Sequence, residues 1–174
     1  MINLKQTKRE FISELLNRDI KKILDLGCGE LLFPKKFLER GSFVKGIDIK
    51  EPSEVPEGVV FVKGNILNEE FGENYDLIIS SLILHLFKRK YALEIISKMK
   101  NSTISKGYNL LVLLSDKDSF YNEEKFFPSL EEISRLYSGW KLIKSLEDET
   151  EPENHSDNLS VHNHKLIFLI FQKV

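Results

Sequence analysis

The spacing of the hydrophobic positions changes along the chain. From Leu4 to Asn17 they recur at helical intervals among lysines and acids, which predicts an amphipathic helix with one buried stripe. Short apolar runs then follow without strict alternation, as is typical of strands buried on both faces of a parallel sheet. These runs are Lys22 to Leu26, Phe43 to Ile47, Val59 to Val62, Tyr75 to Ser80 and Tyr108 to Leu114.

Helical patterns alternate with several of the predicted strands. Leu32 to Arg40 is predicted as the first crossover helix, with Pro34 in its first turn and Gly41 just beyond its end. Tyr91 to Met99 also shows helical spacing, and a turn is predicted at Ser105 to Gly107. This alternation indicates an α/β fold with a mostly parallel sheet and right-handed crossovers.

Two connections between predicted strands are short. Lys50 to Gly58 contains Pro52 and Pro56, so no full helix fits there, and Asn65 to Asn74 is of similar length. Parallel strands usually need a connection of about a dozen residues. We therefore expect this part of the sheet to be poorly covered, with an exposed apolar patch through which a homodimer could form.

The last third of the chain has a different pattern. Ser129 and Glu132 match a capping box, which predicts the start of a helix. Trp140 to Leu146 and Lys165 to Phe171 are predicted as strands. Because no helix lies between them, we expect an antiparallel hairpin with a long loop.

Composition narrows the classes of function. The 174 residues are 41% hydrophobic, which suits one domain, and we expect residues 1–174 to form it. Charged residues make up 30% of the chain but nearly cancel to a net charge of −2, so nucleic-acid binding is not favoured. Cys28 is the only cysteine, which excludes an intrachain disulfide and suits a reducing, cytoplasmic setting. No apolar run approaches the roughly 20 residues that span a bilayer, so no membrane insertion is expected.

The segment ILDLGCGEL joins the first predicted strand to the first predicted helix and contains Gly27 and Gly29. Such a turn lies at the carboxyl edge of a parallel sheet, where α/β proteins bind ligands. Asp48 ends the next strand, about 20 residues later, where a carboxylate can accept hydrogen bonds from both hydroxyls of a ribose. Each feature alone also fits an ordinary turn or an exposed strand end, but together they predict a nucleoside site.

The residues around this loop disfavour a dinucleotide. A dinucleotide site has a third glycine, in G-x-G-x-x-G, and Leu32 occupies that position. Asp25 precedes Gly27 by two residues and suits a positively charged ligand group better than a diphosphate. A nucleotide-dependent oxidoreductase is therefore the weaker alternative.

The motifs between Ile23 and Leu114 resemble those of the seven-stranded class I S-adenosylmethionine-dependent methyltransferases. Asp25-Leu26-Gly27-Cys28-Gly29 matches their first motif, D-x-G-C-G, and Asp48 matches their acidic ribose ligand. The segments VKGNIL and NYDLIISSLILHLF are similar to the family's adenine-flanking pair and fourth-strand segment. The resemblance implies S-adenosylmethionine as cofactor, bound by Asp25, Gly27, Cys28, Gly29, Asp48, Ile49, Asn65, Ile66 and Ser81.

The resemblance also implies a fold. It is a Rossmann-like sheet of order 3-2-1-4-5-7-6, with the last strand antiparallel and helices on both faces. Two positions depart from the family pattern, because Leu31 stands where a third glycine is frequent and Asn65 replaces a commoner aspartate. Asparagine can still hydrogen-bond the adenine edge, so we expect cofactor binding to be weakened and not lost.

His85, after the fourth predicted strand, is the candidate catalytic residue. Methyl transfer is an in-line displacement that requires a near-attack geometry and exclusion of water. A general base is needed only when the acceptor must lose a proton, and the ordinary pKa of histidine, near 6.5, suits that role. Soft acceptors such as thiolates or selenium and tellurium anions need no base, and His85 would then only shape the pocket.

The acceptor is expected to be a small molecule. Related enzymes that methylate exocyclic amines use an N-P-P-Y-like loop, which Ser80-Ser81-Leu82-Ile83 does not match. Cytosine methylation needs a cysteine nucleophile in another loop, whereas Cys28 lies in the cofactor motif. The alternatives are a protein or RNA methyltransferase and a noncatalytic module that binds S-adenosylmethionine.

The C-terminal segment is similar to that of the tellurite-resistance and thiopurine-type methyltransferases, in which a lid and a histidine-bearing hairpin border the substrate pocket. The candidate lid residues are Phe120, Tyr121, Phe126 and Phe127. The loop from Glu147 to His164 contains six acids and three histidines. The histidines, His155, His162 and His164, suit an anionic acceptor or a metal, but a solvated loop is the favoured interpretation and no metal site is predicted.

Overall fold

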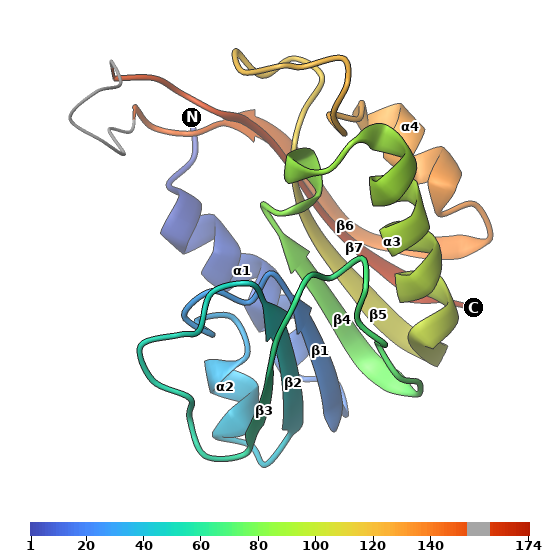
Figure 1. Cartoon of the computed structure of the whole chain (residues 1–174). Coiled ribbons are helices and arrows are strands. Elements are labelled where there is room, and N and C mark those ends of the chain that lie inside the picture. The colour runs from blue at the N-terminus through green and yellow to red at the C-terminus, as the bar shows by residue number, and fades with distance from the viewer. Residues whose placement is uncertain (153–160) are drawn as a thin grey trace.

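The computed structural model describes residues 1–152 and 161–174. The chain forms one seven-stranded sheet (Figure 1). The strand order is β3-β2-β1-β4-β5-β7-β6. The pairs are parallel except that β7 is antiparallel to both β5 and β6. The predicted fold class and strand order are therefore confirmed. The strands are β1 Lys22–Leu26, β2 Phe43–Asp48, β3 Val59–Lys63, β4 Tyr75–Ser81, β5 Thr103–Leu114, β6 Trp140–Glu149 and β7 Lys165–Lys173.

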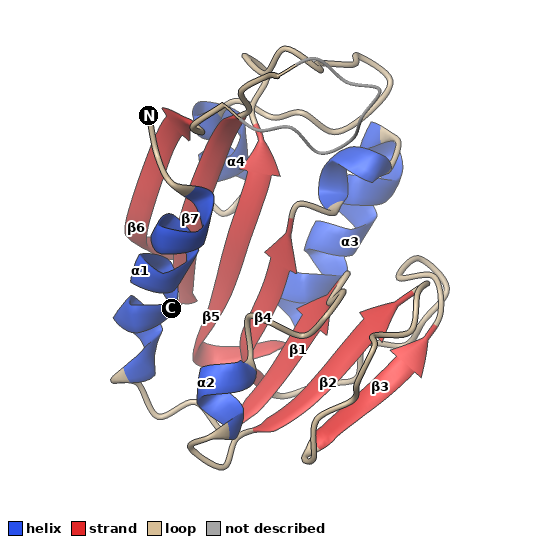
Figure 2. Cartoon of the chain, turned by 90° about the vertical axis from the view of Figure 1, so that its left-hand side faces the viewer, coloured by secondary structure: helices blue, strands red, loops and turns tan. Residues whose placement is uncertain are grey.

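Helices cover both faces of the sheet (Figure 2). They are α1 Leu4–Leu16, α2 Lys35–Leu38, the 3-10 turn η1 Leu84–Leu86, α3 Arg89–Ser102 and α4 Leu130–Leu136. On one face, Phe11 of α1 and Phe37 of α2 pack in a cluster with apolar residues of the strands. On the other face, Met99 of α3 and Ile133 of α4 do the same. The central strands are thus buried on both sides, which is why their sequences are continuously apolar.

Two local predictions differ from the structure. The predicted helix from Leu32 to Arg40 is reduced to the four residues of α2. Leu31 has a positive φ of 55°, and Pro34 disfavours helical backbone at the residue before it, so the helix begins only after Pro34. The turn predicted at 105–107 lies within β5, where Lys106 has a φ of 65° and the register with β4 shifts.

The sheet is poorly covered near its β3 edge, as the short connections predict. Residues 50–58 and 65–74 contain no helix. Val60 is 48% exposed and Phe43 is 43% exposed, and the register of β2 with β3 places both on the same face. Two apolar side chains are therefore exposed on this face, whereas a contiguous apolar patch and the homodimer stay predictions.

The C-terminal strands form the predicted antiparallel hairpin, with Trp140 opposite Lys173. The start of the chain is attached to this hairpin. Ile2 N–H donates to the Glu149 carbonyl over 2.7 Å, and Glu151 N–H donates to the Ile2 carbonyl over 2.9 Å. The first turn of α1 is therefore held beside the end of β6.

Candidate functional site

The glycine loop lies across the carboxyl end of β2. Gly27 N–H donates to the Ile47 carbonyl over 2.8 Å, and Gly29 N–H donates to a carboxylate oxygen of Asp48 over 2.9 Å. Both glycines have positive φ angles, 66° for Gly27 and 48° for Gly29, which glycine adopts without a steric penalty. The structure thus brings the loop and Asp48 together.

Leu31 takes the backbone conformation that a glycine usually supplies. Its φ is 55°, its N–H donates to the Cys28 carbonyl over 2.8 Å, and its side chain is buried. Left-handed backbone costs an L-residue about 1 to 2 kcal/mol. The loop therefore keeps this turn despite the substitution that the sequence shows, and burial of the leucine side chain offsets part of the cost.

Cys28 is a packing residue and not a reactive thiol. Its Sγ lies 2.9 Å from where a Cβ on Gly46 would stand, so the glycine in β2 makes room for it. Burial, together with the charges of Asp25 and Asp48, raises the pKa of the Cys28 thiol to about 12. The thiol therefore stays protonated at neutral pH, which excludes it as a nucleophile.

A cavity of about 700 Å³ opens beside the glycine loop, between α1 and α2. Four of the predicted cofactor residues line it, namely Asp25, Gly27, Cys28 and Ser81. The Ser81 hydroxyl is buried and has no hydrogen-bond partner among the described residues, so a ligand in the cavity can supply one. The rest of the lining is Leu4, Lys5, Lys8, Arg9, Ile12, Glu30, Leu32, Phe33, Lys35, Lys36 and Glu39.

Asp25 lines this cavity and is only 2% exposed. Burial, together with the nearby charge of Asp48, raises the pKa of its carboxyl to about 8, whereas the charge of Lys8 acts in the opposite direction. A carboxyl held in this way gains most from a cationic partner that enters the cavity. This geometry agrees with the sequence argument for a positively charged ligand group.

The other predicted cofactor residues lie outside the cavity lining, Gly29 in the glycine loop and the rest at or just after the ends of β2 and β3. Gly64 N–H donates to the Asp48 carbonyl over 2.9 Å and holds these two ends together. Ile49 is 67% exposed and Asn65 is exposed, so both present side chains at this edge. Ile66 is buried in the core on the α3 side and presents little side-chain surface.

His85 lies in η1, just after β4. Its Nδ1 is buried and has no hydrogen-bond partner among the described residues, and its ring meets the edge of Phe127 at 6.1 Å between centroids. Burial, together with the positive charges of Lys125 and His164, lowers the pKa of His85 to about 4. His85 is therefore neutral at physiological pH and is a weak base.

A second cluster lies near His85 and contains a residue that sequence reasoning missed. The buried carboxylate of Asp118 accepts a hydrogen bond from Lys165 N–H over 2.7 Å and lies 3.2 Å from Nδ1 of His164. The ring of Phe120 packs on His162 and His164, at 4.9 and 5.4 Å between centroids. No spacing rule marks Asp118 in advance, because its partners are 46 and 47 residues away.

The candidate lid residues divide into two kinds. Phe126 and Phe127 are buried, at 0% and 5% exposure, whereas Phe120 and Tyr121 are exposed.

Among residues 1–152 and 161–174, no group of three His, Cys, Asp or Glu side chains could hold a metal ion. His155 lies outside the described residues. In the same described ranges, no helix combines the length and the apolar character needed to cross a membrane.

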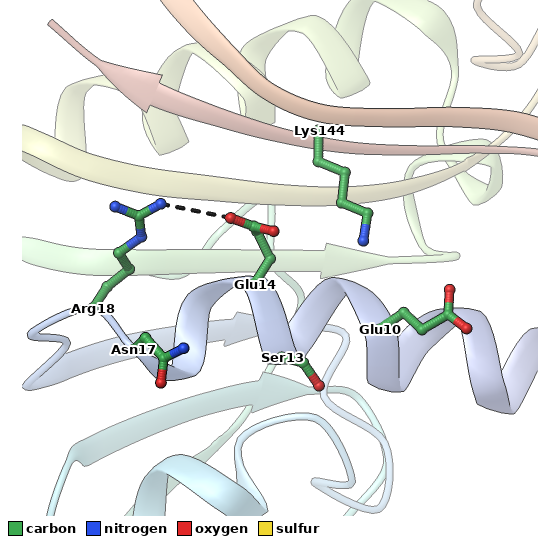
Figure 3. A pocket seen from close by; sticks show the side chains of 6 residues that line it. All are labelled: Glu10, Ser13, Glu14, Asn17, Arg18 and Lys144. Carbon is green, nitrogen blue, oxygen red and sulfur yellow. Dashed lines mark ion pairs between the residues drawn. The ribbon is translucent and has the colours of Figure 1, made fainter.

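A second depression lies on the other side of α1, against β6 (Figure 3). Glu14 and Arg18 form an ion pair of 3.5 Å there, and Lys144 reaches in from β6. The six lining residues, Glu10, Ser13, Glu14, Asn17, Arg18 and Lys144, include none of the predicted site residues. The cavity at the glycine loop is therefore the candidate site.

The sheet order, the glycine loop and the acidic end of β2 are those of the class I S-adenosylmethionine-dependent methyltransferase fold. The model of one family, described as tellurite resistance protein TehB, matches residues 2–169. The chain therefore belongs to the TehB family. A comparison with curated proteins gave no match.

Solved structures support the same fold. TehB from Haemophilus influenzae superposes with a TM-score of 0.78 at 21% identity over 95% of this chain, which spans 62% of that protein. N-methyltransferase NodS from Bradyrhizobium japonicum, in complex with S-adenosylhomocysteine, gives 0.76 at 13% identity over 98% of this chain and 88% of NodS. The 1,6-didemethyltoxoflavin-N1-methyltransferase of Burkholderia thailandensis, with 1,6-didemethyltoxoflavin and S-adenosylhomocysteine bound, gives 0.72 at 16% identity over 97% of this chain and 77% of that enzyme.

Proposed function

We propose that this protein transfers a methyl group from S-adenosylmethionine to a small-molecule acceptor. The observation that carries the proposal is the cavity lined by Asp25 and the glycine loop, with Asp48 at the same sheet edge. A small acceptor is supported by the toxoflavin-type enzyme, which has the same fold and holds a small substrate. The net charge of the chain, −2, does not favour a polyanionic substrate such as a nucleic acid.

The residues present fit the cofactor. We assign Asp25 to its ammonium group and Ser81, whose buried hydroxyl lacks a partner among the described residues, to its amino-acid portion. Asp48 accepts from Gly29 N–H and Lys50 N–H, and its remaining lone pairs suit the ribose hydroxyls. Ile49 and Asn65 are assigned to the adenine, with Ile66 supporting them from the core.

The sequence leaves two roles open for His85, and the environment of its side chain favours one of them. When bound, S-adenosylmethionine supplies an electrophilic methyl group on a sulfonium. An imidazole with a pKa of about 4 stays neutral and removes protons poorly at pH 7. We therefore assign His85 to hydrogen bonding and positioning of the acceptor, which suits soft acceptors that are already deprotonated, such as thiolates. The ring of Phe127 beside it helps to exclude water.

An acceptor screen tests this function. The protein is titrated calorimetrically with S-adenosylhomocysteine and with NAD. Formation of S-adenosylhomocysteine from S-adenosylmethionine is then measured with thiols, amines, phenols and metalloid oxyanions as acceptors. We expect heat with S-adenosylhomocysteine, none with NAD, and turnover with at least one small acceptor. Absence of heat with S-adenosylhomocysteine would refute the cofactor assignment. Binding without turnover across the panel would instead favour the noncatalytic module.

Asp48→Ala tests the ribose assignment. The change leaves ribose hydroxyls and Gly29 N–H without their acceptor, so S-adenosylhomocysteine binding should weaken by about 1 to 3 kcal/mol, or roughly 5- to 150-fold in Kd. Titration calorimetry measures this loss. Glu54→Ala, which removes an exposed acid of the next loop, is the control and should bind as the wild type does. An unchanged Kd for Asp48→Ala would contradict the assignment.

A further inference from the structure

Two neighbouring aromatic side chains are exposed on the loop that follows β5. Phe120 is 44% exposed and Tyr121 is 54% exposed. Both belong to residues 115–128, here named the aromatic loop, which lies between β5 and α4 (Figure 1). An aromatic ring stabilises a fold mainly through the large area that it buries, so adjacent exposed rings leave much of that stabilisation unused. The packing of the fold therefore does not explain this pair.

A buried carboxylate fixes the first part of the aromatic loop. The Asp118 side chain is fully buried and accepts hydrogen bonds from Phe120 N–H over 2.8 Å and from Lys165 N–H over 2.7 Å. It also lies 3.2 Å from Nδ1 of His164. A carboxylate is costly to bury unless hydrogen bonds satisfy it. The backbone that carries the two exposed rings is therefore held in place by the start of β7.

The second part of the aromatic loop is held against the segment that follows η1. Phe126 N–H donates to the Phe87 carbonyl over 3.2 Å, and Arg89 N–H donates to the Glu124 carbonyl over 3.3 Å. The loop thus bridges from the C-terminal hairpin to the element that contains His85.

Ring contacts continue from Tyr121 to His85. The Tyr121 ring meets Phe127 edge-on at 5.8 Å between centroids, and Phe127 meets His85 in the same way at 6.1 Å. Nδ1 of His85 is buried and has no hydrogen-bond partner among the described residues, so a ligand or a water molecule has to supply one. The exposed tyrosine and the unsatisfied nitrogen thus belong to one connected set of rings.

This set of rings is joined to the cofactor cavity by a short segment. Ser81, the last residue of β4, lines the cavity, and His85 follows in η1. Ile83, which lies between them, packs so closely on the glycine loop that a Cβ on Gly27 would be 2.7 Å from its Cγ1. A molecule held by the rings would therefore lie at the same sheet edge as the cavity, as an acceptor has to.

We propose that the aromatic loop binds an acceptor whose methyl-accepting atom is attached to a planar aromatic ring. This inference rests on the proposed function, which places S-adenosylmethionine in the cavity. The ring of the acceptor packs on Tyr121, Phe120 extends the aromatic surface, and the accepting atom hydrogen-bonds Nδ1 of His85.

Two other classes of acceptor suit these surroundings less well. Lys125 places positive charge near His85, which disfavours a cationic acceptor. A small inorganic oxyanion needs hydrogen-bond donors to replace its water, and the faces of aromatic rings supply none. An aromatic acceptor that is neutral or anionic gains from both the rings and the histidine.

Binding of the acceptor is measured in a complex that cannot react. Protein saturated with S-adenosylhomocysteine has no methyl group to transfer, so calorimetric titration with thiophenol, cyclohexanethiol and selenite measures binding alone. The two thiols have rings of the same size, but only that of thiophenol is planar and aromatic. Each thiol Kd is expressed for the thiolate form, because the two thiols ionise differently. The variants are Tyr121→Ala and Tyr121→Phe, with Phe43→Ala as the matched control, since Phe43 is a similarly exposed ring at the amino end of β2.

We expect the wild type to bind thiophenol about 2- to 12-fold more tightly than cyclohexanethiol, the range that aromatic pairs add beyond the burial of area. Tyr121→Ala should remove this difference, whereas Tyr121→Phe should keep it because the ring remains. Phe43→Ala should match the wild type. The Kd of S-adenosylhomocysteine should be the same in all four proteins, which would show that the fold and the cavity are intact.

Three results would overturn the proposal for the aromatic loop. One is that the wild type binds the two thiols equally or binds neither. Another is a preference for thiophenol that survives Tyr121→Ala, and the third is tighter binding of selenite than of thiophenol. Failure of the proposed function is a separate result, in which the wild type does not bind S-adenosylhomocysteine or methylates no acceptor of the panel.

Discussion

Asp25 is a carboxyl group in an environment that opposes its charge. Its pKa is raised from 3.8 to about 8, first by burial and then by Asp48. Between these two values the folded protein holds a proton that the unfolded chain has released. The stability of the ligand-free protein must therefore fall as pH rises from about 4 toward 8, and the loss is complete above the folded pKa.

Asp25→Asn removes this dependence. Relative to the wild type, the variant should gain stability with rising pH, by at most about 1.4 kcal/mol per pH unit. Urea denaturation of both proteins without ligand between pH 5 and 9 measures the difference. The same variant should bind S-adenosylhomocysteine more weakly, since the ammonium group loses its anionic partner. A stability difference that does not change with pH would show that the carboxyl ionises normally.

Alanine substitutions at Gly27 and Gly29 distinguish the cost of backbone strain from the cost of steric overlap. A methyl group on Gly27 would lie 2.7 Å from Cγ1 of Ile83, whereas one on Gly29 would meet no atom within 4 Å. Both positions have positive φ, which costs alanine about 1 to 2 kcal/mol. We expect Gly29→Ala to lose about that much in denaturant unfolding, and Gly27→Ala to lose about 1 to 3 kcal/mol more. Equal losses would mean that Ile83 moves aside freely.

At the scale of elements, the N-cap of α4 could be predicted from the sequence, whereas residues with unusual backbone angles could not. Ser129 accepts from Glu132 N–H over 3.1 Å at the start of α4, as the S-x-x-E pattern predicts. The shortening of α2 depends on Leu31, which adopts a left-handed backbone that leucine rarely takes. The irregular start of β5 depends in the same way on Lys106. The backbone conformation of such residues is set by tertiary packing, which cannot be inferred from the pattern of a single sequence.

Removal of the Ser129 cap should destabilise α4. Ser129→Ala leaves the Glu132 N–H without its acceptor, which costs about 1 kcal/mol. Thermal or urea unfolding followed by circular dichroism measures the loss. Ser134→Ala is the control in the same helix, because the Ser134 hydroxyl donates to the Leu130 carbonyl one turn earlier and its removal should cost little. Similar losses for the two variants would argue against a capping role.

At the scale of the molecule, the apolar runs and the family resemblance were sufficient to predict the sheet and its strand order. Strands that are buried on both faces have continuously apolar sequences, which can be recognised. They also placed Asp25, the glycines, Asp48 and Ser81 at one edge, since the ends of parallel strands meet there. The contact between Lys8 and Phe33 was not predictable, because it joins α1 to the segment after the glycine loop only once the sheet has formed. Asp118 was hidden for the same reason, since its partners come from the last hairpin.

The position of β7 also has a consequence for how the molecule is made. This strand is inserted between β5 and β6, although both precede it in the chain. While the polypeptide emerges from the ribosome, the apolar edge of β5 has no neighbour and β6 has nothing to pair with. Open edges of this kind invite pairing with other nascent chains. Chaperone dependence and aggregation during expression should therefore be governed by the interval before residues 165–173 are synthesised.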